Sequence, residues 1–117
     1  LYDYPVSQAS FSKKSDADPR FAERFEVYLA GWELGNAFTE LTDATEQRAR
    51  CLEDLAERER LGKLSIPLDE AFLQALEKGI PPTGGIAMGV DRIATLFADA
   101  PSIQDVLLFP ATEMFDL

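Results

Sequence analysis

The sequence predicts an α+β fold in which helices cover an antiparallel β-sheet. Two strand-like runs are joined by only two residues, Ala30-Gly31, which is the length of a tight hairpin loop. The predicted elements follow in the order strand, hairpin, two helices, strand, helix and strand, and this order favours an antiparallel sheet. A chain of 117 residues can bury one modest core, so we expect a single domain over residues 1–117.

The first half of the chain carries the predicted strands. Leu1 to Val6 is typical of a short strand, and the polar loop after it ends at Pro19. The hairpin strands run from Arg24 to Leu29 and from Trp32 to Leu41. Alternating side chains of each strand then face opposite sides of the sheet.

Two helices are predicted after the hairpin. Asp43, followed three residues later by Glu46, is typical of a capping box, and Gly62 ends that helix. The second helix extends from Asp69 to Lys78, with Gly79 directly after it.

The last third of the chain begins with a glycine-rich strand. On one face of this strand lie Gly85, Ala87 and Gly89, so a flat ligand could lie against its backbone. A helical pattern follows, with Arg92 in its first turn, where a cation is unfavourable unless an anion such as phosphate lies nearby. The alternative is that the glycines only permit close packing and that Arg92 is solvated. Asp105 to Phe109 is predicted to be a buried strand.

Two carboxylates of the hairpin are candidate metal ligands. With Ala30-Gly31 as the loop, Tyr28 pairs with Glu33 and Glu26 pairs with Gly35, so Glu26 and Glu33 share a face. Like charges at this spacing repel unless a metal cation or an arginine lies between them, and oxygen ligands suit Mg²⁺. The alternative is a pair of solvated carboxylates.

Further along the same strand, Asn36, Phe38 and Glu40 alternate onto one face. The aromatic ring of Phe38, with the amide of Asn36 on one side and the carboxylate of Glu40 on the other, predicts a pocket for an amine with an aliphatic body. Glu33 is out of phase with these three residues, and Gly35 is a position where a bulge could bring it onto their face.

Composition excludes several kinds of chemistry. The chain has no histidine, so the usual general base and zinc ligand are missing, and its single cysteine, Cys51, suits the cytoplasm. No apolar run reaches the roughly 18 residues of a membrane span. A net charge of −10 disfavours nucleic-acid contact by this segment. The chain begins at Leu1, and we interpret it as a piece of a longer protein.

Several ordered stretches resemble the catalytic domain of class II lysyl-tRNA synthetases. They are Glu23-Arg24-Phe25-Glu26, Glu33 to Leu41, Pro81 to Gly85, Gly89-Val90-Asp91-Arg92, which is similar to motif 3 of that class, and Ser102 to Pro110. The resemblance covers essentially all 117 residues. It implies the C-terminal part of a class II aminoacyl-tRNA synthetase-like catalytic domain.

The resemblance also implies roles for individual residues. Glu26 and Glu33 would hold Mg²⁺ on ATP, Arg92 would bind the γ-phosphate, and Leu34 and Gly89 would contact the nucleotide, with Arg92 and Glu33 as the catalytic residues. Lysine or β-lysine would be bound by Asn36, Phe38, Glu40, Gly85 and Ala87. The segments that supply motifs 1 and 2 in this family are not among these residues, so we expect the 117 residues alone to be inactive.

At two places the chain departs from the usual sequence of lysyl-tRNA synthetases, and both departures favour a particular branch of the family. Ala87 stands where these synthetases usually have glycine, and Pro5 to Ser10 replaces their usual sequence. Both resemble the truncated lysyl-tRNA synthetase paralogue known as EpmA, GenX or PoxA, which ligates β-lysine to elongation factor P. We therefore expect a cytoplasmic, homodimeric ATP-dependent ligase acting on elongation factor P. A lysine-tRNA ligase that charges tRNA(Lys) is the alternative, and a non-catalytic binding module is the third hypothesis.

Overall fold

The computed structural model describes residues 1–114, and it contains one four-stranded antiparallel sheet in the order β1-β2-β3-β4. The strands are β1 (Tyr2–Pro5), β2 (Phe21–Leu29), β3 (Trp32–Thr39) and β4 (Gly84–Met88). The α-helices are α1 (Ala44–Arg60), α2 (Glu70–Glu77), α3 (Val90–Phe97) and α4 (Ala111–Met114), with 3-10 turns at η1 (Val6–Gln8) and η2 (Ile103–Val106). The predicted α+β class is confirmed.

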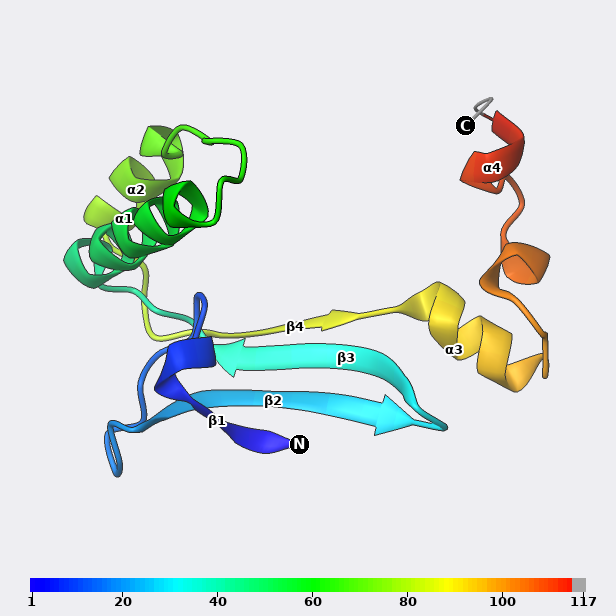
Figure 1. The fold of residues 1–117 in the computed structure, drawn as a ribbon. Coiled ribbons are helices and arrows are strands. Elements are labelled where there is room, and N and C mark those ends of the chain that lie inside the picture. The colour runs from blue at the N-terminus through cyan, green and yellow to red at the C-terminus, as the bar shows by residue number, and fades with distance from the viewer. Residues whose placement is uncertain (115–117) are drawn as a thin grey trace.

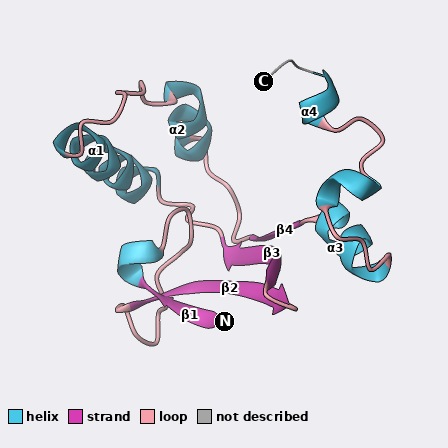
Figure 2. Ribbon diagram, turned by 45° about the vertical axis from the view of Figure 1, so that its right-hand side comes forward, coloured by secondary structure: helices cyan, strands magenta, loops and turns pink. Residues whose placement is uncertain are grey.

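The helices gather at the two ends of the sheet. Helices α1 and α2 lie beyond the end of β3, and α3 lies beside the β2–β3 hairpin turn (Figure 1). The same separation is visible after a 45° turn (Figure 2). Both faces of the sheet therefore remain largely open within the described part of the chain.

The hairpin forms at the predicted loop. Ala30 and Gly31 have φ values of 50° and 81°, and this left-handed pair suits a two-residue turn between twisted strands. Leu29 pairs with Trp32 and Tyr28 with Glu33, as predicted.

The register beyond that point differs from the prediction. The expected pairing of Glu26 with Gly35 is wrong, because Val27 pairs with Gly35 and Glu26 pairs with Asn36. The cause is a β-bulge in which β3 carries one extra residue, Leu34. An odd number of inserted residues reverses the alternation of side chains, so Glu33 and Asn36 lie on the same face.

Helices α1 and α2 begin directly after Asp43 and Asp69, close to their predicted starts. The Asp43 side chain accepts from the backbone N–H groups of Thr45 and Glu46, and Gly62 follows α1 with φ 65°. The predicted capping box is only half formed, because the Glu46 carboxylate binds Lys14 and Arg50 instead of reaching back to the cap.

The predicted strand from Asp105 to Phe109 is wrong. Ser102 and Asp105 form a reciprocal capping box that starts the 3-10 turn η2, while Leu108 and Phe109 are 90% and 75% exposed. A strand needs a neighbour along its length, and its propensity depends on that context. No strand of the described residues pairs with this segment.

Candidate adenylation site

One face of the sheet collects the residues that the sequence singled out on three elements. Glu26 lies opposite Asn36, and Asn36 in turn lies opposite Ala87 on β4. Phe38 pairs with Gly85 on the same face. We call this surface the substrate face, because it carries every side chain assigned to lysine or to metal binding.

The Glu26 carboxylate is held by three neighbours. Its Oε2 accepts from the hydroxyls of Tyr4, at 2.5 Å, and Tyr28, at 2.6 Å, and its Oε1 accepts from Arg24. These hydrogen bonds, that of Tyr28 first, lower the pKa of Glu26, although its burial at 9% exposure opposes the shift. The same carboxylate raises the pKa of Tyr4 to about 12, chiefly through the hydrogen bond. Glu26 is therefore an ionised group with a fixed orientation.

Arg24 and the two tyrosines are site residues that the sequence reasoning did not identify. Arg24 and Tyr28 stand two positions before and after Glu26 on β2, so the period of two would have placed them beside it. Tyr4 comes from β1, whose pairing with β2 is irregular between Tyr2 and Tyr4. No pattern in the sequence indicates that contact.

Glycine at position 85 leaves the space that the Glu40 carboxylate occupies. A Cβ on Gly85 would collide with Glu40 Oε1, so this glycine is required by a close approach and not by its backbone angles. Glu40 is thereby positioned over the bare part of β4.

Glu40 and Phe38 also line a cavity of about 440 Å³ at the end of β3. The other lining residues are mostly apolar: Phe11, Leu41, Thr42, Gln47, Phe72, Leu76, Ile80 and Thr83. An apolar space with one carboxylate matches an aliphatic chain that ends in an amine.

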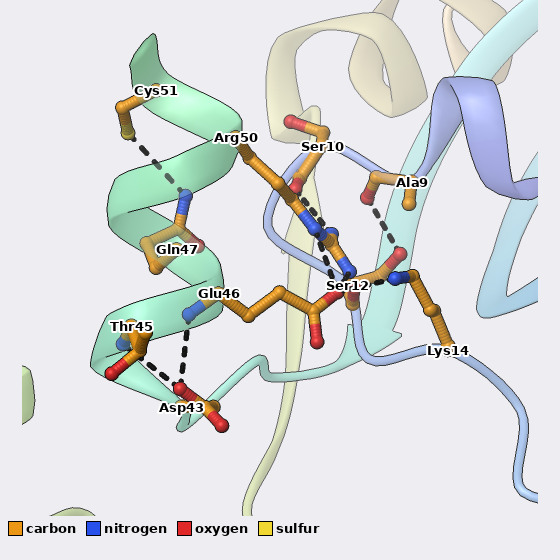
Figure 3. A network of polar contacts seen from close by, with 10 residues as sticks. All are labelled: Ala9, Ser10, Ser12, Lys14, Asp43, Thr45, Glu46, Gln47, Arg50 and Cys51. Atoms are coloured by element: carbon orange, nitrogen blue, oxygen red, sulfur yellow. Dashed lines mark hydrogen bonds and ion pairs between the residues drawn. The ribbon is translucent and has the colours of Figure 1, made fainter. Parts of the chain in front are cut away.

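Backbone contacts fix the position of Glu40. Lys13 N–H donates to the Thr39 carbonyl and Leu41 N–H donates to the Phe11 carbonyl, both at 2.8 Å. Arg50 of α1 donates to the carbonyls of Ser10 and Ser12 (Figure 3). The loop after β1 is thus held between α1 and the end of β3.

Arg92 lies at the other end of the substrate face. Its guanidinium donates to the Glu33 carbonyl at 2.6 Å, and its side chain remains exposed. Gly89 N–H donates to the Leu34 carbonyl at 2.9 Å, which joins the start of α3 to the bulge. A Cβ on Gly89 would lie 3.3 Å from Arg92 Cδ, so glycine keeps this approach open. Arg92 is therefore in contact with Glu33 through the backbone carbonyl of Glu33.

The donor set can be compared with what Mg²⁺ requires. Within residues 1–114 there is no group of three or more acidic, cysteine or histidine side chains that could hold a metal ion. Mg²⁺ is often bound by one or two carboxylates together with substrate phosphates and water. Glu26 and the half-buried Glu33 fit this mode, in which phosphate oxygens complete the coordination.

The chain is similar to a known protein family and to several curated proteins. The family described as tRNA synthetases class II (D, K and N) matches residues 1–113. The lysine-tRNA ligase of Pediococcus pentosaceus is 49% identical over 116 residues, which are 99% of this chain and 23% of the relative. That of Sinorhizobium medicae is 47% identical over 108 residues, 92% of this chain and 22% of the relative.

The lysine-tRNA ligase of Staphylococcus saprophyticus is 48% identical over 110 residues, which are 94% of this chain and 22% of the relative. The chain spans less than a quarter of the length of these curated relatives. Among the described residues, no helix is long and apolar enough to cross a membrane. Because the family match extends over almost the whole chain, this protein belongs to the class II tRNA synthetases of the D, K and N group.

Proposed function

We propose that residues 1–117 form the C-terminal part of a catalytic domain that activates lysine with ATP and transfers it to tRNA(Lys). The observation that carries the proposal is the substrate face. It has an acidic, apolar-walled cavity at one end, and at the other Arg92 contacts the Glu33 carbonyl on the strand pair that carries the Glu26 and Glu33 side chains. An amine and a polyphosphate are the two ligands that this charge distribution would hold side by side.

The roles of the side chains follow from their places on this face. Glu40 would bind the side-chain amine of lysine, and Phe38 would pack against its methylene groups. Asn36, opposite Ala87, would hold the carboxylate end, and Arg92 would bind the γ-phosphate. Mg²⁺ bound by Glu26 and Glu33 would neutralise phosphate charge. The lysine carboxylate would then attack the α-phosphate in line, forming lysyl-adenylate and releasing pyrophosphate.

The names of the relatives favour tRNA(Lys) as the acceptor. Those described above carry the name lysine-tRNA ligase, whereas the sequence alone favoured elongation factor P. The net charge of −10 implies that other segments of the enzyme would contact the tRNA. We extend the proposal to a cytoplasmic homodimer, as expected from the resemblance.

A second candidate function is the ligation of β-lysine to elongation factor P. Ala87 favours it, because its methyl lies on the substrate face opposite Asn36. A methyl on the floor of the site would displace the amino acid backbone, where α- and β-lysine differ. Such a difference is worth about 1–3 kcal/mol between two substrates, so Ala87 alone does not decide between the functions.

The proposal is tested with the intact enzyme that contains this chain. Pyrophosphate exchange is measured with lysine, β-lysine and ornithine, and acyl transfer is then measured to tRNA(Lys) and to elongation factor P. We expect lysine-dependent exchange and transfer to tRNA(Lys). Preference for β-lysine with transfer only to elongation factor P would establish the second candidate. Absence of exchange with every amino acid would leave the non-catalytic binding module.

A further inference from the structure

Arg24 contacts both halves of the substrate face with a single guanidinium. Its Nε donates to Asn36 Oδ1 at 3.2 Å, and one terminal nitrogen donates to Glu26 Oε1 at 2.5 Å. The other terminal nitrogen donates to the Gln8 carbonyl at 2.7 Å, and the guanidinium lies 4.6 Å from the centre of the Tyr4 ring. The side chain is only 16% exposed, and its contacts with Asn36 and Glu26 are partly buried, whereas the contact with the Gln8 carbonyl is exposed.

The contact with Asn36 fixes the orientation of an amide. Arginine can only donate, so the amide oxygen of Asn36 must face it. The Asn36 NH₂ group then points away from Arg24 and is available as a donor. An amide turned by 180° would present its oxygen to an incoming carboxylate and repel it.

The hydrogen bond from Arg24 orients the Glu26 carboxylate but does not use all of its lone pairs. Arg24 uses Oε1, while Tyr4 and Tyr28 use Oε2. A carboxylate has about four lone-pair positions, so these three donors leave acceptor capacity for a cation. Because the guanidinium is planar and its donors have a fixed angle, the two acceptors are also held relative to each other.

We propose that Arg24 is a positioning residue that sets both the amino acid end and the metal end of the site through Asn36 and Glu26. This inference rests on the proposed function and adds a residue to it. Lysine in place of Arg24 would carry the charge without the fork, so it cannot bind Asn36, Glu26 and the Gln8 carbonyl together.

The test uses Arg24→Gln and Arg24→Lys in the intact enzyme, with Arg20→Gln as the matched control. Arg20 is nearby, but its side chain is 80% exposed and is paired with Asp18. Pyrophosphate exchange gives kcat, the KM for lysine, the KM for ATP and the Mg²⁺ concentration for half-maximal rate. We expect both Arg24 variants to raise the lysine KM and the Mg²⁺ requirement about tenfold, as for the loss of charged hydrogen bonds, and Arg20→Gln to change neither.

A second measurement separates positioning from folding. If Arg24 acts through Asn36, then adding Arg24→Gln to Asn36→Ala should raise the lysine KM less than twofold further. A purely structural role would lower the active fraction, and therefore kcat, with both KM values unchanged. Thermal unfolding of each variant is measured alongside.

Failure of the proposed function and failure of the Arg24 role would give different kinetic results. Wild-type exchange without lysine dependence would contradict the proposed function. If wild-type exchange depends on lysine, an unchanged lysine KM in the Arg24→Lys variant, or full additivity with Asn36→Ala, would overturn the role of Arg24 alone. Should Arg24→Gln fail to fold, Arg24→Lys decides the question because it retains the charge beside Glu26.

Discussion

The two faces of the sheet differ in whether their side chains find partners within the described part of the chain. On the substrate face, Glu26 is surrounded by Arg24, Tyr4 and Tyr28, so its polar groups are satisfied within the chain. On the opposite face, which we call the apolar face, large side chains of β2 and β4, the two strands that flank β3, remain 41–59% exposed: Phe25, Val27, Leu29, Ile86 and Met88. A contiguous apolar surface of this kind indicates that something covers it.

The two faces therefore contribute to different properties: the substrate face to the geometry of the site, and the apolar face to the stability of the fold. The arrangement of the substrate face follows from contacts among β1, β2, β3 and β4, all of which lie in the chain. Burial of the apolar face, which would supply much of the hydrophobic stabilisation, is not achieved by the described residues. Substitutions on the two faces should therefore change different measured quantities.

The largest expected effect compares two adjacent residues of β2. Glu26→Gln in the intact enzyme removes the charge that would bind Mg²⁺, and we expect kcat for pyrophosphate exchange to fall about 10²–10³-fold. Val27→Thr, on the apolar face, should leave kcat within twofold and lower the unfolding temperature. Equal loss of kcat in the two variants, at matched folded fractions, would remove the functional distinction between the faces.

The next effect concerns Ala87 on β4. Ala87→Gly removes the methyl opposite Asn36, and we expect the ratio of exchange rates with α- and β-lysine to change by about tenfold or more. Ala17→Gly, in the exposed loop before β2, is the control and should not change the ratio. An unchanged ratio in Ala87→Gly would leave the β-lysine candidate without its structural support.

A third comparison uses the adjacent glycines of β4. A Cβ at position 85 meets the Glu40 carboxylate, whereas a Cβ at position 84 meets only the Phe38 carbonyl at 3.8 Å. Glu40 can move, so Gly85→Ala should fold normally but raise the lysine KM about tenfold through the loss of a charged hydrogen bond. Gly84→Ala should leave this KM unchanged. If both variants behave alike in steady-state kinetics, Glu40 is not the group that binds the amine.

The smallest effect is on stability in acid. The pKa of folded Glu26 is depressed, so its contribution to stability is present above about pH 4.5, the ordinary glutamate value, and is lost as pH falls through the lower folded pKa. Tyr28→Phe removes the main cause of the depression. We therefore expect its acid unfolding midpoint to rise by a few tenths of a pH unit, about the scale of a single hydrogen bond.

The control for this measurement is Tyr2→Phe. Tyr2 is 80% exposed, and its acid unfolding midpoint, followed by circular dichroism, should match that of the wild type. A midpoint that moves to lower pH in Tyr28→Phe would contradict the assigned direction of the Glu26 shift.

Much of the fold was accessible from local patterns. The hairpin turn at Ala30-Gly31, the cap Asp43, the start of a helix near Asp69 and the strand-to-helix change at Gly89 were predicted correctly, because each depends on a few consecutive residues. The expectation that Glu26 and Glu33 share a face was also correct, since the side-chain period of two determines it.

The failures lie where contacts are made between distant segments. The predicted pairing of Glu26 with Gly35 is wrong because of the bulge at Leu34, which is a property of the pairing of two strands and not of either strand. A bulge near Gly35 that brings Glu33 onto the face of Asn36 was allowed for from the sequence, and the bulge lies one residue earlier. The sequence beyond Asp105 has strand propensity but lacks a neighbouring strand among the described residues, so it forms η2 and an exposed loop.

The sequence by itself determined which residue types are available on each face and where the chain turns, because backbone geometry repeats over two or four residues. Only the tertiary structure decided that Tyr4 of β1 holds Glu26 of β2 and that Glu40 occupies the space above Gly85. Those contacts join residues from different strands and loops, and their formation depends on strand register and side-chain volume, which no local pattern specifies.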